Sequence, residues 1–157
     1  MGLLDTISRK IQGVDRLDRQ KLDIHAKQWV NTKAVDISKL KGKVILVEFA
    51  AIESESKEII DQLNIWDQMF PKDSFQMISV YSPKAKEMKK VKLFASKTGM
   101  KYPIALDSNM KTADLFNVRF RPIFFLFDRK GRLRYRILNT KDLERIGSAI
   151  MKLLSQK

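Results

Sequence analysis

The feature that most constrains the fold is the nearly continuous apolar run from Val44 to Phe49. Such a run is typical of a central strand that is covered on both faces. The residues after it show helical periodicity, with apolar side chains at Ile59, Ile60, Leu63, Trp66, Met69 and Phe70. Pro71 ends that helix, because proline cannot continue the helical hydrogen bonding. A buried strand that leads into an amphipathic helix predicts a layered α/β domain.

Similar patterns recur along the rest of the chain. We expect strands at 74–82, 102–107, 122–128 and 132–138, and helices at 84–98, 110–117 and from Thr140, as N-cap, to the end. Gly99 is expected to end a helix, and Gly131 to form a tight turn between the last two strands. Crossover helices imply parallel pairing in the first part, and the tight turn implies antiparallel pairing at the end. The predicted architecture is a mixed sheet flanked by helices.

The N-terminal residues stand outside this pattern. Apolar residues recur every three or four positions and predict an amphipathic helix over about 3–20, at Leu3, Leu4, Ile7, Ile11, Val14 and Leu17. We therefore divide the chain into an N-terminal helix and linker, residues 1–28, and one domain, residues 29–157. The start, MGLLDT, also fits a loose acylation pattern with Gly2 as the acceptor. Gly2, Leu3, Leu4, Ile7 and Ile11 are the candidate anchor to a membrane or a partner.

Composition excludes several classes of chemistry. The 157 residues include no cysteine, so a thiol nucleophile, a disulfide and a thiolate metal site are all excluded. A single histidine, His25, leaves little scope for a histidine-based metal site, and we interpret it as an exposed polar residue. We expect no metal and no cofactor. No transmembrane helix and no signal peptide is predicted, so we expect a soluble or peripheral membrane protein.

Charge indicates an acidic partner. The chain carries 31 Lys and Arg against 18 Asp and Glu, a formal net charge of +13. The densest basic segment is the predicted hairpin at 119–136, where Arg132, Arg134 and Arg136 alternate. Alternation on a strand would place these three guanidinium groups on one face, which would suit an anion. An acidic protein surface, an anionic membrane and a nucleic acid all remain open as partners.

The order of these landmarks resembles the thioredoxin superfamily. The resemblance rests on LKGKVILVEFA, the helix that follows it, YPIALD, LFNVRFRPIFFLFDRKGRLRYR and the last helix, and it covers about residues 29–155. The branch that it resembles is the TlpA/ResA type, which is related to the AhpC/TSA group. It implies a three-layer sandwich. It also implies a cis Arg121–Pro122 bond beside the redox turn, with Phe120, Arg121 and Pro122 facing a partner.

The catalytic motif of that family, W-C-x-x-C, is absent from this chain. Its place is taken by Glu53, Ser54, Glu55, Ser56 and Lys57. Glu53 and Ser56 occupy the cysteine positions in one alignment, and Ser54 and Lys57 in the other. Hydroxyl and carboxylate groups cannot form the mixed disulfide that thiol exchange requires. We expect Ser54 or Ser56 to cap the helix and the glutamates to lie near its positive end on an exposed turn.

These observations favour a protein without enzymatic activity that works by binding. The leading interpretation is a redox-inactive accessory or scaffold subunit of a larger assembly, whose partner has an acidic surface. One alternative is an adaptor that the N-terminal helix, with possible acylation, attaches to an anionic membrane. Another is a basic protein associated with nucleic acid or ribonucleoprotein. An enzyme of another kind ranks last, because no acid, base, nucleophile or metal ligands gather in one segment.

Overall fold

The structure is a computed structural model that describes residues 20–138 and 143–156. Six strands form one sheet in the order β1-β4-β3-β2-β5-β6. The strands are β1 (Gln28–Val30), β2 (Val44–Ala50), β3 (Phe75–Tyr81), β4 (Ile104–Leu106), β5 (Ile123–Phe127) and β6 (Leu133–Ile137). The α-helices are α2 (Lys57–Met69), α3 (Met88–Thr98), α4 (Lys111–Leu115) and α5 (Leu143–Ser155). Short 3-10 helices are η2 (Ile37–Leu40), η3 (Ile52–Ser54) and η4 (Ala85–Glu87).

Strand pairing confirms the mixed sheet. β2 pairs in parallel with β3, and β3 with β4, while β5 runs antiparallel to β2 and β6 antiparallel to β5. Every residue of β2 is buried, as expected for a strand covered on both faces. The edge strand β1, which pairs antiparallel with β4, was not predicted from the sequence.

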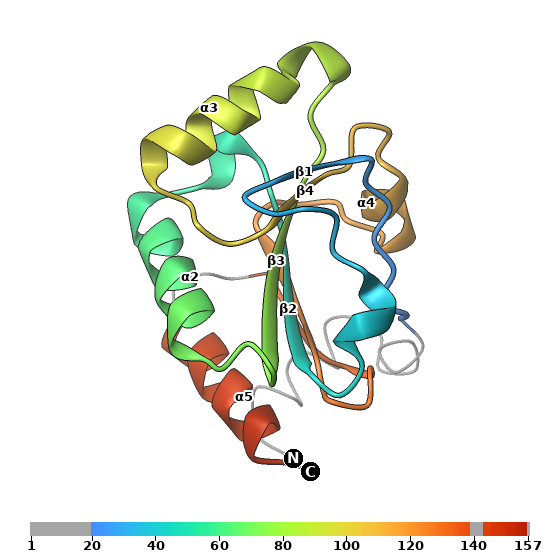
Figure 1. Cartoon of the computed structure of the whole chain (residues 1–157), viewed down its shortest axis with the longest axis vertical. Coiled ribbons are helices and arrows are strands. Elements are labelled where there is room, and N and C mark those ends of the chain that lie inside the picture. Colours follow the sequence, from blue (N-terminus) through green and yellow to red (C-terminus); the bar gives the residue numbers. More distant parts are fainter. Residues whose placement is uncertain (1–19, 139–142, 157) are drawn as a thin grey trace.

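Helices cover both faces of the sheet. α2, α3 and α5 lie on one face and α4 on the other, as Figure 1 shows. Alternate residues of β2 divide between two apolar clusters: Leu46 belongs to the first, with Trp66 and Ile150, and Val47 to the second, with Phe116. Gly147 lets α5 approach α2 closely, because a Cβ there would lie 3.3 Å from Nε1 of Trp66.

Local signals fix where several elements end. Gly99 caps α3 in the left-handed conformation with φ 73°, and Gly131 has φ 78° in the β5–β6 turn, so both predictions are confirmed. The helix predicted over 84–98 is divided into η4 and α3. The helix predicted over 3–20 lies outside the described residues except for Gln20. The candidate anchor residues Gly2, Leu3, Leu4, Ile7 and Ile11 and the Thr140 cap also lie outside them.

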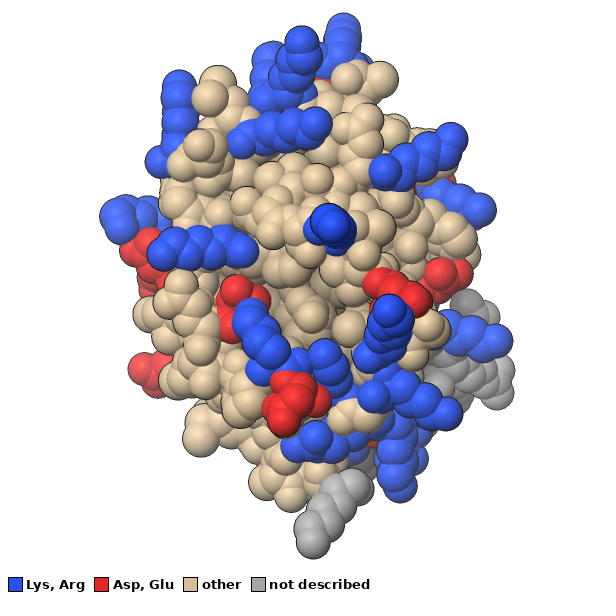
Figure 2. Space-filling view, in the orientation of Figure 1, with Lys and Arg blue, Asp and Glu red and all other residues tan. Residues whose placement is uncertain are grey.

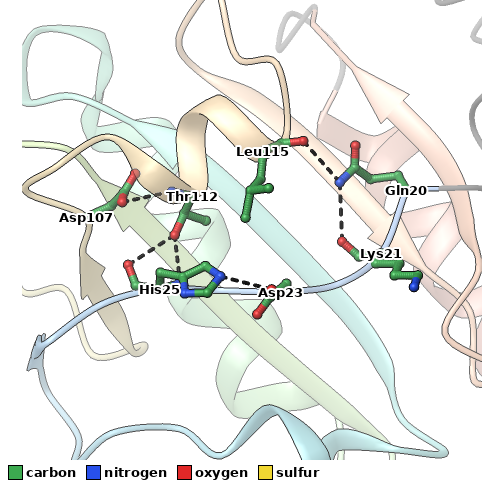
Figure 3. A network of polar contacts seen from close by, with 7 residues as sticks. All are labelled: Gln20, Lys21, Asp23, His25, Asp107, Thr112 and Leu115. Carbon is green, nitrogen blue, oxygen red and sulfur yellow. Dashed lines mark hydrogen bonds and ion pairs between the residues drawn. The ribbon is translucent and has the colours of Figure 1, made fainter.

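Residues 20–26, here called the strap, lie across α4 (Figure 3). The backbone N–H of His25 donates to Oγ1 of Thr112 at 2.8 Å, and the Thr112 hydroxyl donates to the His25 carbonyl at 3.1 Å. The Gln20 side chain donates to the Leu115 carbonyl at 3.4 Å. Leu22, Ile24 and Ala26 pack against the second apolar cluster. The strap is therefore packed against the domain.

Candidate functional site

The turn between β2 and α2 stands where the family motif would place its cysteines. Two serines hold its backbone. Oγ of Ser54 accepts from the Ala51 N–H at 3.0 Å and donates to the Ala51 carbonyl at 2.9 Å. Oγ of Ser56 accepts from the Ile59 N–H at 3.2 Å, which confirms Ser56 as the N-cap of α2. Both hydroxyls therefore support the backbone of the turn.

Glu55 departs from the expected exposed turn. Both of its carboxylate oxygens are buried, and its side chain contacts that of Glu48 in the middle of β2. Glu48 is fully buried, and its Oε1 accepts a hydrogen bond from the Ser79 hydroxyl at 2.7 Å. The prediction that the glutamates lie on an exposed turn holds for Glu53, which is exposed, and is wrong for Glu55.

The Glu48–Glu55 pair retains a proton at neutral pH. Burial is the largest effect on both groups, because it disfavours a charged carboxylate. It raises the pKa of Glu48, although hydrogen bonds from Glu55 and Ser79 act in the opposite direction. Burial and then the neighbouring charge of Glu48 raise the pKa of Glu55 to about 10. Two carboxyl groups in contact share a proton more readily than both ionise, so one donates to the other.

Two tyrosines belong to the same buried cluster. Burial, and then the charges of the two glutamates, raise the pKa values of Tyr81 and Tyr102. The Tyr81 hydroxyl donates to Sδ of Met100 at 3.9 Å, whereas the Tyr102 hydroxyl has no hydrogen-bond partner among the described residues. These phenols stay protonated, and so they cannot serve as bases at neutral pH.

A groove lies beside this cluster, at the carboxyl ends of β2 and β3. It encloses about 270 Å³ and joins the turn to the loop before β5. Its lining includes Ile52, Glu53, Lys90, Met110 and Arg121. Tyr81 lines the groove, whereas neither Glu48 nor Glu55 does. A substrate in the groove would meet no catalytic acid or base from that pair.

The loop before β5 supplies the opposite side of the groove. The Arg121–Pro122 peptide bond is cis, as the resemblance implied. Phe120, beside it, is 70% exposed, which is unusual for a large aromatic side chain. Nη2 of Arg121 is buried without a hydrogen-bond partner among the described residues. This loop therefore combines an exposed ring with a guanidinium group that can still donate.

The structure separates the other predicted residues from the groove. Lys57 is highly exposed and pairs with Asp61 on the next turn of α2 at 2.7 Å. Arg132 precedes β6, so that strand carries two of the three predicted arginines. A register shift at Leu126/Phe127 accompanies this end of the hairpin. The predicted alternation begins one residue before β6, and Arg132 and Arg134 both reach Oδ2 of Asp128.

The hairpin arginines have partners within the domain. Arg132 and Arg134 contact Oδ2 of Asp128 at 3.2 and 3.4 Å. Burial opposes ionisation of Asp128, but hydrogen bonds from the backbone N–H groups of Arg132 and Lys130 outweigh it and lower the pKa. Arg136 lies over the Phe125 ring at 5.4 Å. Much of this basic charge stabilises the hairpin itself.

His25 has a structural place in the strap. Its ring contacts the Asp23 carboxylate at 2.9 Å, and its backbone is tied to Thr112 (Figure 3). Asp107 accepts the N–H groups of Thr112 and Ala113, both at 2.9 Å, and so caps α4. No cluster of three or more His, Cys, Asp or Glu side chains suited to a metal occurs in the described part of the chain.

Sequence reasoning missed Glu48, Tyr81 and Tyr102. The available signal was an acidic residue within an otherwise apolar central strand, because a carboxyl group there is buried and needs a partner. Its partner, Glu55, is seven positions away in the sequence and belongs to a turn, so periodicity alone could not pair them. The tyrosines lie in or beside predicted strands, where an aromatic residue is usual.

No helix within residues 20–138 and 143–156 has the length and apolar content that a bilayer crossing requires.

Known proteins resemble this chain in both sequence and fold. "Protein DipZ" of Mycobacterium tuberculosis (strain CDC 1551 / Oshkosh) is 32% identical over 114 residues, which make up 68% of this chain and 16% of DipZ. This chain therefore spans a small part of DipZ. "Thiol-disulfide oxidoreductase ResA" of Bacillus thuringiensis (strain Al Hakam) is 24% identical over 143 residues, covering 87% of this chain and 82% of ResA.

A solved structure supports the fold. The thiol-disulfide isomerase from Corynebacterium glutamicum superposes with a TM-score of 0.74 and 26% identity, over 87% of this chain and 97% of that one. The names of ResA and of the isomerase state thiol-disulfide chemistry. This chain contains no cysteine, and so it lacks the thiol through which that exchange proceeds. The model of the AhpC/TSA family matches residues 19–136. The chain thus belongs to the AhpC/TSA family and has a thioredoxin-like fold.

Proposed function

We propose that this protein acts by binding, as an accessory subunit of a larger protein assembly, and that its groove holds an extended segment of a partner protein. The observation that carries the proposal is the groove of about 270 Å³ between the cysteine-free turn and the cis-proline loop, where the 70% exposed Phe120 is the sequence neighbour of the groove residue Arg121. Exposed aromatic rings next to a preformed hollow are frequent sites of binding energy.

Groove chemistry indicates what such a segment would contain. Ile52 and Met110 offer apolar contacts, and Arg121 offers a guanidinium group without a carboxylate partner among the described ion pairs. Lys90 adds a second cation, while Glu53 adds an acidic group at the same wall. A segment with one apolar side chain and one carboxylate would use these features. Because acidic and basic residues both line the groove, we do not assign the chain's excess of positive charge to it.

A peptide-display selection tests this proposal. A random peptide library is selected on the full chain, and the affinities of enriched peptides are then measured for Phe120→Ala, Arg121→Ala and the control Met151→Ala. Met151 is also an exposed apolar residue, 61% accessible, but it lies on α5. We expect each groove variant to weaken binding by about tenfold or more, as for an interface hot spot, and the control to change it less than about twofold.

Two outcomes would overturn the binding role. Either no peptide is enriched, or the enriched peptides bind Phe120→Ala and Arg121→Ala as well as they bind the unmodified chain. In parallel, an insulin-reduction assay with dithiothreitol should show no acceleration, because thiol exchange needs a thiolate. Measurable turnover in that assay would contradict a non-catalytic role.

A further inference from the structure

A second surface of the domain has a strong positive charge. Lys21, Lys41, Lys43, Arg129 and Lys130, here called the basic end, line a hollow of about 450 Å³. They come from the strap, from the segment between η2 and β2, and from the β5–β6 turn. Figure 2 shows Lys and Arg side chains gathered over this lower right part of the molecule. None of the residues that line the hollow is acidic.

No ion pair among residues 20–138 and 143–156 neutralises the charges of the basic end. The ion pairs found between described residues involve none of its four lysines. Arg129 donates to the backbone carbonyls of Gly42 at 3.3 Å and Leu154 at 2.8 Å rather than to a carboxylate. Asp128, next to it in sequence, is buried and already accepts from Arg132 and Arg134. The basic end therefore presents a positive field to an external anion.

The composition of this surface distinguishes between anionic partners. Four of its five cations are lysines, which act as point charges and suit a diffuse anionic surface better than a planar, bidentate partner. Binding to a single-stranded nucleic acid usually adds aromatic platforms, and no aromatic residue lines this hollow. Partly buried apolar residues, Leu22 and Ile37, line it instead.

The position of the basic end in the chain adds a second argument. Lys21 is separated by one residue, Gln20, from residues 1–19, whose sequence carries the apolar pattern expected of a surface-seeking amphipathic segment. A cluster of basic residues beside such a segment is the combination that binds anionic lipid headgroups. We propose that the basic end docks the folded domain on an anionic membrane surface. This inference is independent of the groove and of its partner.

Vesicle sedimentation of the full chain tests the inference. The probes are vesicles of phosphatidylcholine alone and of phosphatidylcholine mixed with phosphatidylglycerol. The test variant is Lys41→Glu/Lys43→Glu, and the charge-matched control is Lys86→Glu/Lys89→Glu, on η4 and α3. We expect the full chain to bind the mixed vesicles, the test variant to bind at least about 25-fold more weakly, and the control to change by less than about threefold. Binding to phosphatidylcholine alone should be weak, and salt should reduce binding to the mixed vesicles.

A second variant separates docking from a folding defect. Lys21→Glu/Lys130→Glu changes two other elements of the same surface and should lose binding to a similar degree while circular dichroism and the melting curve stay unchanged. Equal losses of vesicle binding in the test and control variants would show that net charge alone determines the affinity, and would overturn the proposal. The absence of binding to mixed vesicles would overturn it too. Tighter binding to a single-stranded RNA, sensitive to the same variants, would assign the surface to nucleic acid instead.

Discussion

The buried Glu48–Glu55 pair makes the stability of the fold depend on pH. An unfolded glutamate has a pKa near 4.5, whereas the folded chain raises that of Glu55 to about 10. Between these values the folded state holds a proton that the unfolded state has released. The free energy of unfolding must therefore fall as the pH rises through this window, and the contribution of the pair is complete only below about pH 4.5.

The size of the effect follows from one retained proton. Each pH unit inside the window lowers the free energy of unfolding by about 1.4 kcal/mol. From pH 6 to pH 8 the loss is about 2.7 kcal/mol, or about 100-fold in the unfolding equilibrium. That is a large part of the total stability of a typical domain, which is roughly 5–15 kcal/mol. This pH dependence of the free energy of unfolding requires only that the Glu48–Glu55 pair keeps one proton in the folded state from pH 6 to pH 8.

Urea denaturation at several pH values measures the slope. Trp66, 3% exposed, reports unfolding by its fluorescence. The reference is Glu48→Gln/Glu55→Gln, whose amides do not titrate and in which Gln at position 48 can still accept from the Ser79 hydroxyl. Burial of two amides changes the absolute stability of the variant, and so the compared quantity is the pH slope. We expect the free energy of unfolding to fall with pH more steeply in the unmodified chain than in the double variant, by about 1.4 kcal/mol per pH unit.

If the free energy of unfolding depended on pH equally in the unmodified chain and in the double variant, the reasoning would be refuted. They would mean that both carboxyl groups are ionised in the folded state and compensated in some other way. Infrared spectroscopy gives an independent check, because a protonated carboxyl group has a carbonyl stretch that a carboxylate lacks. That band should be present at neutral pH and absent from the double variant.

Three further predictions concern single contacts, each measured by urea denaturation. Ser56→Ala should cost about 1 kcal/mol through loss of the α2 cap, while Ser56→Asn should retain most of that stability. Gly147→Val should cost about 1–3 kcal/mol because its side chain meets the buried Trp66 ring, and an unchanged stability would contradict this close approach. Asp128→Asn should lower the free energy of unfolding by about 2 kcal/mol. The difference between the variant and the unmodified chain should shrink below pH 3.8, because the pKa of Asp128 is lowered in the folded state and its stabilising effect is lost when it is protonated.

Local patterns were sufficient to predict most of the fold. β2 and α2 lie where the apolar run and the helical repeat placed them, because burial on both faces and an amphipathic face leave direct marks in the sequence. Gly99 and Gly131 were also recognised, since a left-handed backbone selects glycine. β1 was not predicted, because a strand of three residues is too short to show a periodic pattern. It lies at the edge of the sheet and pairs with a strand 76 positions later.

The site was less predictable for a similar reason. Whether Glu55 faces solvent or the interior is decided by Glu48, a residue of another element, and no local propensity expresses that contact. The pairing of Arg132 and Arg134 with Asp128 was not predicted either, because it depends on how the β5–β6 turn brings the three side chains together. Long-range polar contacts of this kind depend on tertiary structure, which outweighs local pattern.

The same contacts explain how a turn without cysteines keeps a defined groove. Ser54 and Ser56 satisfy the backbone of the turn, and the Glu48–Glu55 contact joins the turn to the central strand. A groove whose walls are fixed before a partner arrives loses less conformational entropy on binding, which favours affinity. Neither Glu48 nor Glu55 lines the groove, so the carboxyl pair does not meet a ligand there. In the proposed binding role, these contacts would position the groove for a partner.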